Sequence, residues 1–259
     1  MLIDAHMHIT KEDVENGMLS ILEREDMVGL VAGTDPVSCA FVRQLSENRR
    51  HIIPTYGLHP WYAGQYKLED MADYLQSCPI IGEIGMDTVW CDVDPDLQRR
   101  IFRLQMDIAQ DRGCPVILHT KGQEKEIAEI IADYTIPVIV HWYSSDDYLE
   151  LYLKRDCYFT AGPDLRQNLA VRQIIREAPL NRLLVESDGI SSVEWATGKA
   201  ITPEELPLLL LDSMSCISEI KGIELRAVRR EMENNLKHLI SVHPIKQLCK
   251  SNKHLQNES

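Results

Sequence analysis

The chain opens with Leu2-Ile3-Asp4-Ala5-His6-Met7-His8, an apolar stretch that reads as a buried strand ending in two histidines. Successive side chains of a strand point to opposite faces, so residues two apart share a face. His6 and His8 are therefore predicted to project together from the end of the first strand. Imidazole is a common metal ligand, so this strand end is a candidate site.

The pattern of a short apolar run followed by a helical segment recurs along the chain. The runs occupy residues 2–5, 28–32, 52–56, 80–84, 116–118, 138–140, 158–161 and 183–185. Eight strands that alternate with helices predict an α/β fold, a single (β/α)8 TIM-type barrel. A doubly wound open sheet shows the same alternation. No glycine-rich phosphate loop follows the first strand, which disfavours the nucleotide-binding form of that alternative.

Helical periodicity fills the spaces between the runs and continues after the last one. We expect one apolar stripe of the segment 96–112 to face the strands: Leu97, Ile101, Leu104 and Ile108. Two further helices are predicted near residues 203–220 and 224–240. No linker or repeat divides the chain, so residues 1–250 are predicted to form one barrel domain with an extra C-terminal helix. A polar tail is predicted at 251–259.

Composition restricts the function classes. The net charge of −13 over 259 residues argues against a protein that coats nucleic acid or an anionic membrane with a basic surface. The seven cysteines are scattered, odd in number and without a C-x-x-C pair, which indicates free, mostly buried thiols in a cytoplasmic protein. Neither a signal peptide nor a transmembrane segment is expected.

Further potential metal ligands stand at the ends of later runs. Active sites of this fold lie at the C-terminal mouth of the barrel, where the strand ends converge. The predicted ligand set is His6, His8, Glu83, His119, His141 and Asp188. Each residue alone has an alternative interpretation as a polar group that hydrogen-bonds nearby backbone. As a set they favour a metal site, because imidazole and carboxylate together suit zinc, manganese or iron.

Four residues beside this set are candidates for supporting roles. His59 follows the third strand and Lys121 follows His119 by two, so both are predicted to face the mouth. Each is predicted to bind substrate, against a loop-anchoring role for His59 and a solvated position for Lys121. Glu186 is expected to lie buried beside the ligands and hold one in place. Asp87 is expected either to orient a ligand or to cap a helix.

At this point the sequence resembles the TatD family of metal-dependent hydrolases, over nearly the whole chain from Ile3 to about Leu239. The resemblance rests on six ordered blocks: Asp4-Ala5-His6-Met7-His8, Gly57-Leu58-His59-Pro60, Ile81-Gly82-Glu83-Ile84-Gly85-Met86-Asp87, Val116-Ile117-Leu118-His119, Val140-His141 and Leu184-Val185-Glu186-Ser187-Asp188. It implies two ions bridged by Glu83. One would be held with His6, His8 and Asp188, and the other with His119 and His141.

The chain departs from the family pattern at three places. Trp61 stands where the family often has a second histidine, and Lys121 stands where it usually has arginine. The block His141-Trp142-Tyr143-Ser144-Ser145 replaces His-Cys-Phe-Ser-Gly. All three departures lie on the substrate side of the predicted site. Trp61 and Trp142 are interpreted as packing residues, with stacking on a base or sugar as the alternative.

The predicted function is a divalent-metal-dependent phosphodiesterase or deoxyribonuclease that acts on nucleic-acid ends through a water activated by two metal ions. The cofactors would be two zinc, magnesium or manganese ions. Asp188 is the predicted general base and Glu83 the bridge, while His59 and Lys121 would hold phosphate oxygens. No extended duplex binding and no membrane partner are expected. An amidase, deacylase or lactonase is the alternative, and a non-catalytic metal-binding scaffold is the second.

Overall fold

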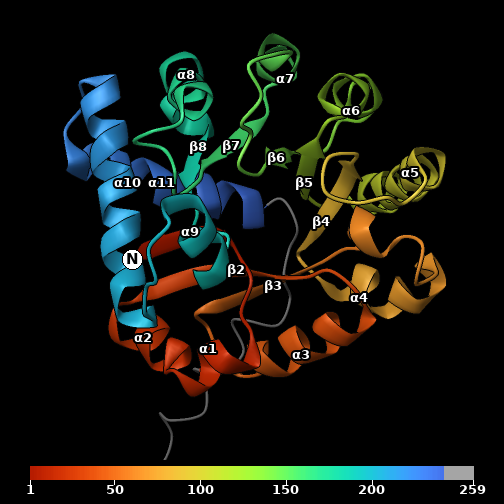
Figure 1. Cartoon of the computed structure of the whole chain (residues 1–259), viewed down its shortest axis with the longest axis horizontal. Helices are drawn as coiled ribbons and strands as arrows, with labels where there is room; N and C mark the ends of the chain where they lie inside the picture. Colours follow the sequence, from red (N-terminus) through yellow and green to blue (C-terminus); the bar gives the residue numbers. More distant parts are fainter. Residues whose placement is uncertain (242–259) are drawn as a thin grey trace, which may run out of the picture.

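The computed structural model describes residues 1–241, and it shows eight parallel strands surrounded by helices (Figure 1). This architecture confirms the predicted barrel. The strands are β1 (Leu2–Met7), β2 (Met27–Gly33), β3 (Ile52–Tyr56), β4 (Ile80–Asp87), β5 (Val116–Lys121), β6 (Val138–Val140), β7 (Tyr158–Ala161) and β8 (Leu183–Val185). The tail predicted at 251–259 lies outside the described residues, as do Cys249, His243 and His254.

The helices form an outer ring, which in Figure 1 runs from α2 and α3 through α5 to α8 and on to α10. Their bounds are α1 (Lys11–Glu15), α2 (Met18–Arg24), α3 (Pro36–Ser46), α4 (Ala72–Ser77), α5 (Pro95–Arg112), α6 (Glu124–Ile131), α7 (Leu149–Lys154), α8 (Leu169–Glu177), α9 (Ile190–Thr197), α10 (Leu206–Lys221) and α11 (Leu225–Ser241). Four short 3-10 turns complete the set: η1 (Pro60–Tyr62), η2 (Leu68–Met71), η3 (Leu180–Arg182) and η4 (Pro203–Glu205).

The strands follow one another in the order β1 to β8, so the barrel is nearly closed and its seam lies between the first and last strands. At this seam the backbone N–H of Asp188 donates to the carbonyl oxygen of His6 at 3.0 Å. The contact joins the two ends of the barrel at its C-terminal mouth. It also fixes the spacing between two predicted ligands.

Four strands, β1, β2, β4 and β5, are longer than the apolar runs that predicted them. Glu83 does not end the fourth strand as predicted, because β4 continues to Asp87. The extension is possible because β4 packs closely on β5: a Cβ atom at Gly85, whose φ is +146°, would lie 2.0 Å from the carbonyl oxygen of His119. Glycine is the residue that permits this approach. Asp87 and Lys121 are register partners at the end of the paired strands.

Helix α5 begins and ends on clear local signals. The Asp94 side chain accepts the backbone N–H of Asp96 at 3.0 Å, Pro95 occupies the first turn, and Gly113 closes the helix with φ +63°. A carboxylate cap, a first-turn proline and a left-handed glycine are the expected boundary residues of a helix.

The apolar stripe predicted for α5 is wrong in part, because Leu104 is 45% exposed. The helix is turned so that Gln98 and Gln105 are buried instead. The Gln105 amide donates to the carbonyl of Leu58 and accepts its N–H, at 3.1 and 2.7 Å. Gln98 makes the same pair of bonds with Asp87, at 2.9 and 2.7 Å. The helix therefore holds the chain after β3 and β4, where site residues lie.

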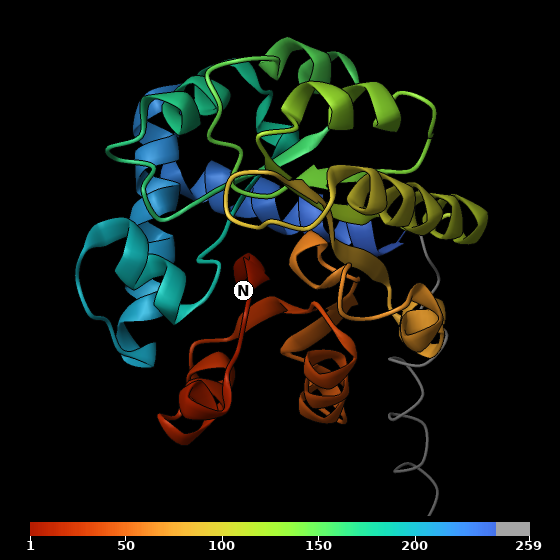
Figure 2. The same ribbon diagram turned by 45° about the vertical axis from the view of Figure 1, so that its right-hand side comes forward.

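Helix α11 crosses the end of the barrel opposite the mouth (Figure 2). The Asn235 amide donates to the carbonyls of Leu180 and Leu183, at 3.0 and 2.8 Å, and Glu233 accepts the N-terminal ammonium of Met1 at 3.2 Å. These partners all lie at the N-terminal ends of β1 and β8. The predicted extra C-terminal helix thus covers the end of the fold that serves stability.

Six of the seven cysteines fall within residues 1–241, and all six are free thiols. Five are buried and Cys91 is partly exposed, which agrees with the prediction of mostly buried thiols. Within the described chain, none of the helices has the length and apolar character needed to cross a membrane.

Candidate metal centre

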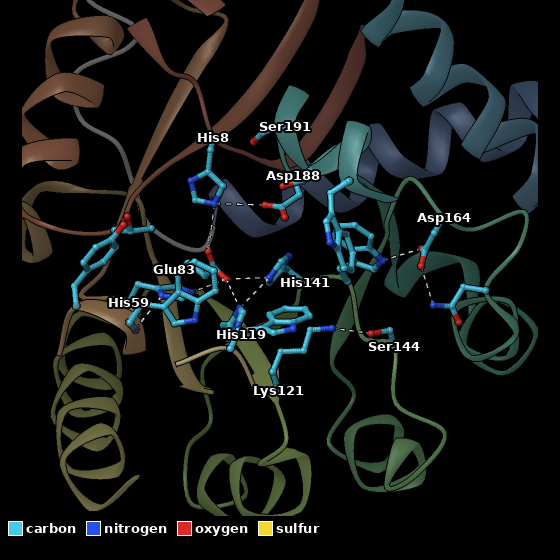
Figure 3. A pocket seen from close by; sticks show the side chains of 18 residues that line it. His8, His59, Glu83, His119, Lys121, His141, Ser144, Asp164, Asp188 and Ser191 are labelled. Atoms are coloured by element: carbon cyan, nitrogen blue, oxygen red, sulfur yellow. Dashed lines mark hydrogen bonds and ion pairs between the residues drawn. The ribbon is translucent and has the colours of Figure 1, made fainter. Parts of the chain in front are cut away.

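The structure brings all six predicted ligands together at the C-terminal mouth, around Glu83. Figure 3 shows the members that line the pocket, which are His8, Glu83, His119, His141 and Asp188. Their donor atoms form overlapping groups, each with all atoms within 4.8 Å of one another: His6, Glu83 and His141; His6, His8 and Asp188; His59, Glu83 and His119. His6, His8 and Glu83 are each more than 100 residues from Asp188 in the sequence, so the barrel itself creates the cluster.

The two oxygens of Glu83 face different histidines. Oε2 lies 3.3 Å from Nε2 of His6 and 3.4 Å from Nε2 of His8. Oε1 lies 2.8 Å from Nδ1 of His119 and 2.9 Å from Nε2 of His141. The carboxylate therefore stands between two pairs of imidazoles, with one oxygen directed to each pair. This arrangement allows it to bridge two ions.

Asp188 completes the group formed by His6 and His8. Its Oδ1 lies 3.4 Å from Nε2 of each histidine. The residue adopts a left-handed backbone conformation with φ +59°, which is uncommon for residues other than glycine, although aspartate adopts it more readily than most. Such conformations cluster at functional sites, where the surrounding structure holds them.

Buried polar atoms without hydrogen-bond partners mark the middle of the cluster. Among the described residues they include both ring nitrogens of His6 and Oδ1 of Asp188. The distances between them permit ion pairing, but the atoms are not aligned for hydrogen bonds. A buried polar atom left unsatisfied is costly, so such atoms indicate a missing partner. Imidazole nitrogens and carboxylate oxygens suit a divalent cation, and the residues present therefore fit a metal.

The charges of the cluster also favour a cation. Burial alone would raise the pKa of Glu83, but His141, His59 and His6 outweigh it and hold that pKa well below its usual value. Burial alone would lower the pKa of His6, yet Glu83 and Asp188 raise it well above the ordinary value. The pKa of His141 rises to about 9, because Glu83 outweighs the effect of burial. The carboxylates thus remain ionised and attract positive charge.

Asp87 takes the first of the two roles that the sequence left open, because it orients a ligand; the backbone groups that it also binds belong to a turn, and α5 is capped by Asp94 instead. Its Oδ2 accepts a hydrogen bond from Nε2 of His119 at 2.9 Å and from the indole of Trp61 at 2.7 Å. Its Oδ1 accepts the backbone N–H groups of Val89 and Trp90, both at 2.8 Å. A carboxylate bonded to one nitrogen of an imidazole orients the other nitrogen as a ligand. Asp87 therefore directs Nδ1 of His119 toward Glu83.

Glu186 is fully buried behind His141, where it was expected. Its Oε1 lies 3.4 Å from Nδ1 of His141, on the side of the ring away from Glu83. The separation is that of an ion pair without hydrogen-bond alignment. Carboxylates in this position hold ligating histidines and raise their basicity.

His59 lies closer to the metal ligands than its predicted role as a substrate contact implies. Its Nε2 is 3.4 Å from Oε1 of Glu83, and it forms a ligand group with Glu83 and His119. Its Nδ1 accepts the backbone N–H of Trp61 at 3.2 Å. Burial lowers the pKa of His59 to about 4, which keeps the ring neutral and able to bind a metal. His59 is thus a candidate ligand as well.

Lys121 borders a pocket of about 570 Å³ that opens over the ligands. Its ammonium donates to the hydroxyl of Ser144 at 2.7 Å and lies 5.0 Å from the centre of the Trp90 ring. Burial lowers its pKa from the ordinary value. Among the described residues that line the pocket, it is the sole lysine or arginine. It is therefore placed to meet an anionic group of a bound substrate.

Sequence reasoning missed the residues that hold the site from outside. Gln98 and Gln105 read as part of a polar helix face, and Asp4 reads as one polar residue in an apolar strand. In the structure Asp4 is fully buried and accepts the backbone N–H of Ser187 at 3.0 Å. A buried aspartate beside a histidine pair was the available signal, because buried carboxylates require partners.

Comparisons with known proteins identify a family model and relatives that match most of the chain. A family model described as TatD related DNase matches residues 3–241. The chain is 25% identical over 203 residues to the uncharacterized metal-dependent hydrolase YabD of Bacillus subtilis, covering 73% of this chain and 80% of that protein. It is 28% identical over 245 residues to the uncharacterized metal-dependent hydrolase MJ1582 of Methanocaldococcus jannaschii, covering 90% and 94%. The crystal structure of YjjV, a TatD homolog from Escherichia coli, superposes with a TM-score of 0.80 at 22% identity, over 92% of this chain and 97% of that one.

Proposed function

The chain belongs to the TatD family of metal-dependent hydrolases, and from that premise we propose that it hydrolyses phosphodiester bonds at nucleic-acid ends. The observation that carries the proposal is Glu83, whose two oxygens each face a separate group of imidazoles. Two divalent ions, zinc, magnesium or manganese, would be held by His6, His8 and Asp188 on one side of Glu83 and by His119 and His141 on the other. When bound, such ions activate water and stabilise the charge of an in-line phosphoryl displacement.

Asp188 is the proposed general base. Its Oδ1 faces the ligand cluster and has no hydrogen-bond partner among the described residues, so it is free to accept a proton. The pKa of Asp188 falls to about 2, because the nearby histidines outweigh the effect of burial. It is therefore ionised at neutral pH, as a base must be.

Lys121 is the proposed contact for a non-reacting phosphate oxygen. It lies two residues after His119 on β5 and borders the same pocket as Glu83 and Asp188. A lysine presents a point charge where arginine would present a two-pronged donor, so this contact fixes charge more than orientation. His59 would contribute as a further ligand or as a neutral hydrogen-bond partner.

The proposed substrate is a short end rather than an extended duplex. With a net charge of −13 and one lysine in the pocket lining, the protein has few cationic groups that could bind backbone phosphates. Binding that neutralises one or two phosphates should show a log–log salt slope of about −1 to −2. We also propose a cytoplasmic location, on the scattered cysteines without a C-x-x-C pair.

The test is a metal-reconstituted screen of end-labelled single-stranded oligonucleotides, covalently closed circular duplex, small phosphodiesters and acyl compounds. Shortening of the single strands one residue at a time is expected, with little attack on the circle. Asp188→Asn is the inactive blank, and Asp111→Asn, an exposed change on α5, is the matched control. Efficient nicking of the circle that is lost in Asp188→Asn would overturn the end-specific proposal. Turnover of acyl compounds alone would replace it with the amidase, deacylase or lactonase alternative.

A further inference from the structure

All four tryptophans of the chain line the pocket over the metal ligands. Three of them form a continuous wall. The ring centres of Trp90 and Trp195 are 5.9 Å apart, and those of Trp142 and Trp195 are 6.0 Å apart, with the rings close to perpendicular in both pairs. They come from the chain after β4, the chain after β6 and helix α9, so three separate segments supply one aromatic surface.

Two rings of the wall are largely exposed to solvent, so packing of the core does not explain their positions. Trp195 is 70% exposed and Trp90 is 49% exposed. Large apolar side chains exposed together in a concave region mark binding sites, because a single exposed ring is ordinary and a cluster is not. Trp142, in contrast, is buried, and its indole N–H donates to Oδ1 of Asp164 at 2.7 Å. Asp164 accepts a second bond from Asn168 at 2.8 Å, which fixes the inner end of the wall.

The aromatic wall lies directly beside the candidate metal ligands. The centres of the Trp90 and His119 rings are 6.3 Å apart, and Trp142 directly follows His141 in the sequence. Lys121 lines the same pocket, and its ammonium lies over the Trp90 ring, 5.0 Å from the ring centre. Figure 3 shows Lys121 reaching toward Ser144, on the side of the pocket where Asp164 lies.

We propose that Trp90, Trp142 and Trp195 form a subsite that stacks an aromatic ring of the substrate beside the metal centre. The nearby Lys121 ammonium disfavours a cationic occupant and favours one that carries an anion close to the ring. If the proposed function holds, on which this identification rests, the occupant is the base of the terminal nucleotide. Aromatic side chains bind bases of any sequence through their faces, so the subsite selects for a ring and not for one base.

Binding to the metal-loaded protein tests the subsite without any turnover. The probes are deoxyadenosine monophosphate, 2-deoxyribose 5-phosphate and octyl phosphate, with quenching of tryptophan fluorescence and calorimetry as readouts. We expect Trp195→Ala to weaken the affinity for the nucleotide roughly tenfold, which is in the range known for base stacking. The affinity for the sugar phosphate should be unchanged. Trp195→Phe should recover most of the loss, and Leu208→Ala, which removes another exposed side chain on α10, should have no effect. Equal affinity for octyl phosphate and the nucleotide would overturn the preference for a ring.

Cleavage of oligonucleotides that end in a normal or an abasic residue separates this proposal from the proposed function. Trp195→Ala should lower kcat/KM about tenfold on the normal end and leave the abasic end unchanged. If Trp195→Ala leaves kcat/KM unchanged, or lowers it equally for the normal and the abasic substrate, the subsite proposal is overturned while the proposed function stands. If the protein binds the nucleotide more tightly than the sugar phosphate but cleaves no nucleic acid, the subsite proposal stands and the proposed nuclease function is overturned.

Discussion

Asp4 on β1 accepts two hydrogen bonds from Ser187, one from the backbone N–H at 3.0 Å and one from the hydroxyl. The Ser187 hydroxyl in turn accepts the N–H of Gly189 at 3.0 Å. Asp4 lies two residues before His6, and Ser187 lies directly before Asp188. The pair therefore connects the first and last ligand-bearing segments at the seam of the barrel.

Asp4→Ala is expected to weaken metal binding about 10- to 100-fold, the usual effect of removing a group that holds a ligand in place. It leaves the N–H and hydroxyl of Ser187 buried without an acceptor, at a cost of about 1–3 kcal/mol of stability for each. Asp4→Asn should retain more affinity, because one oxygen can still accept the N–H. Competition with a zinc chelator and thermal unfolding measure the two effects. Wild-type metal affinity in Asp4→Ala would show that the pair does not position Asp188.

Asp87→Asn tests the orientation of His119. The amide can accept a bond from Trp61 but cannot provide the charge that holds Nε2 of His119, so we expect metal affinity to fall about tenfold or more. The fold should persist, since Gln98 binds the Asp87 backbone and not its side chain. Zinc titration of the variant beside Asp111→Asn gives the comparison. An unchanged metal affinity would show that Asp87 only stabilises the turn at Val89 and Trp90 and does not orient His119.

Metal uptake should release protons at neutral pH. The pKa of His141 lies at about 9 and that of His6 lies well above its usual value, so both rings hold protons at pH 7 until a cation displaces them. Metal affinity should therefore fall about tenfold per pH unit below about pH 9 for the proton displaced from His141, and displacement of the proton on His6 should make the fall steeper. Calorimetry in buffers of different ionisation enthalpy counts the protons. An affinity independent of pH between about 6 and 9 would contradict this account.

The same shift predicts a change in the stability of the chelator-treated protein. The raised pKa of His141 means that the folded state binds its proton more tightly than the unfolded state does. This stabilisation is complete below the unfolded pKa of about 6.5 and is lost as pH rises to about 9. The Tm of metal-free protein should accordingly fall between pH 7 and 9, and metal-loaded protein should show a smaller fall. A metal-free Tm that rises over this interval would contradict the assignment.

The sequence predicted the barrel and the grouping of the candidate ligands because both depend on local pattern. Apolar runs of strand length predict strands, and in a parallel barrel all C-terminal strand ends meet at one mouth. That rule brings Glu83, His119 and Asp188 toward one mouth although they are distant in the sequence, and it holds even though β4 continues past Glu83 to Asp87 and β5 past His119 to Lys121. It could not predict which oxygen of Glu83 faces which histidine, since that depends on side-chain geometry.

Contacts between distant segments were not predictable from local pattern. Gln105 is polar and lies on a helix, yet it is buried because it satisfies both backbone groups of Leu58. The exposed Leu104 occupies a position that periodicity assigned to the core. Trp195 lies on α9, a helix that the apolar pattern did not predict, so the aromatic wall emerges only in three dimensions.

The metal content of Glu83→Ala tests the central claim most directly, because Glu83 is the proposed bridge between both ion sites. Elemental analysis should find about two divalent ions per chain in reconstituted wild-type protein and in Glu129→Ala, an exposed change on α6. Glu83→Ala should retain less than about one ion and no hydrolytic activity, with an intact fold by circular dichroism. A folded Glu83→Ala protein that still binds two equivalents would contradict the bridged two-metal centre.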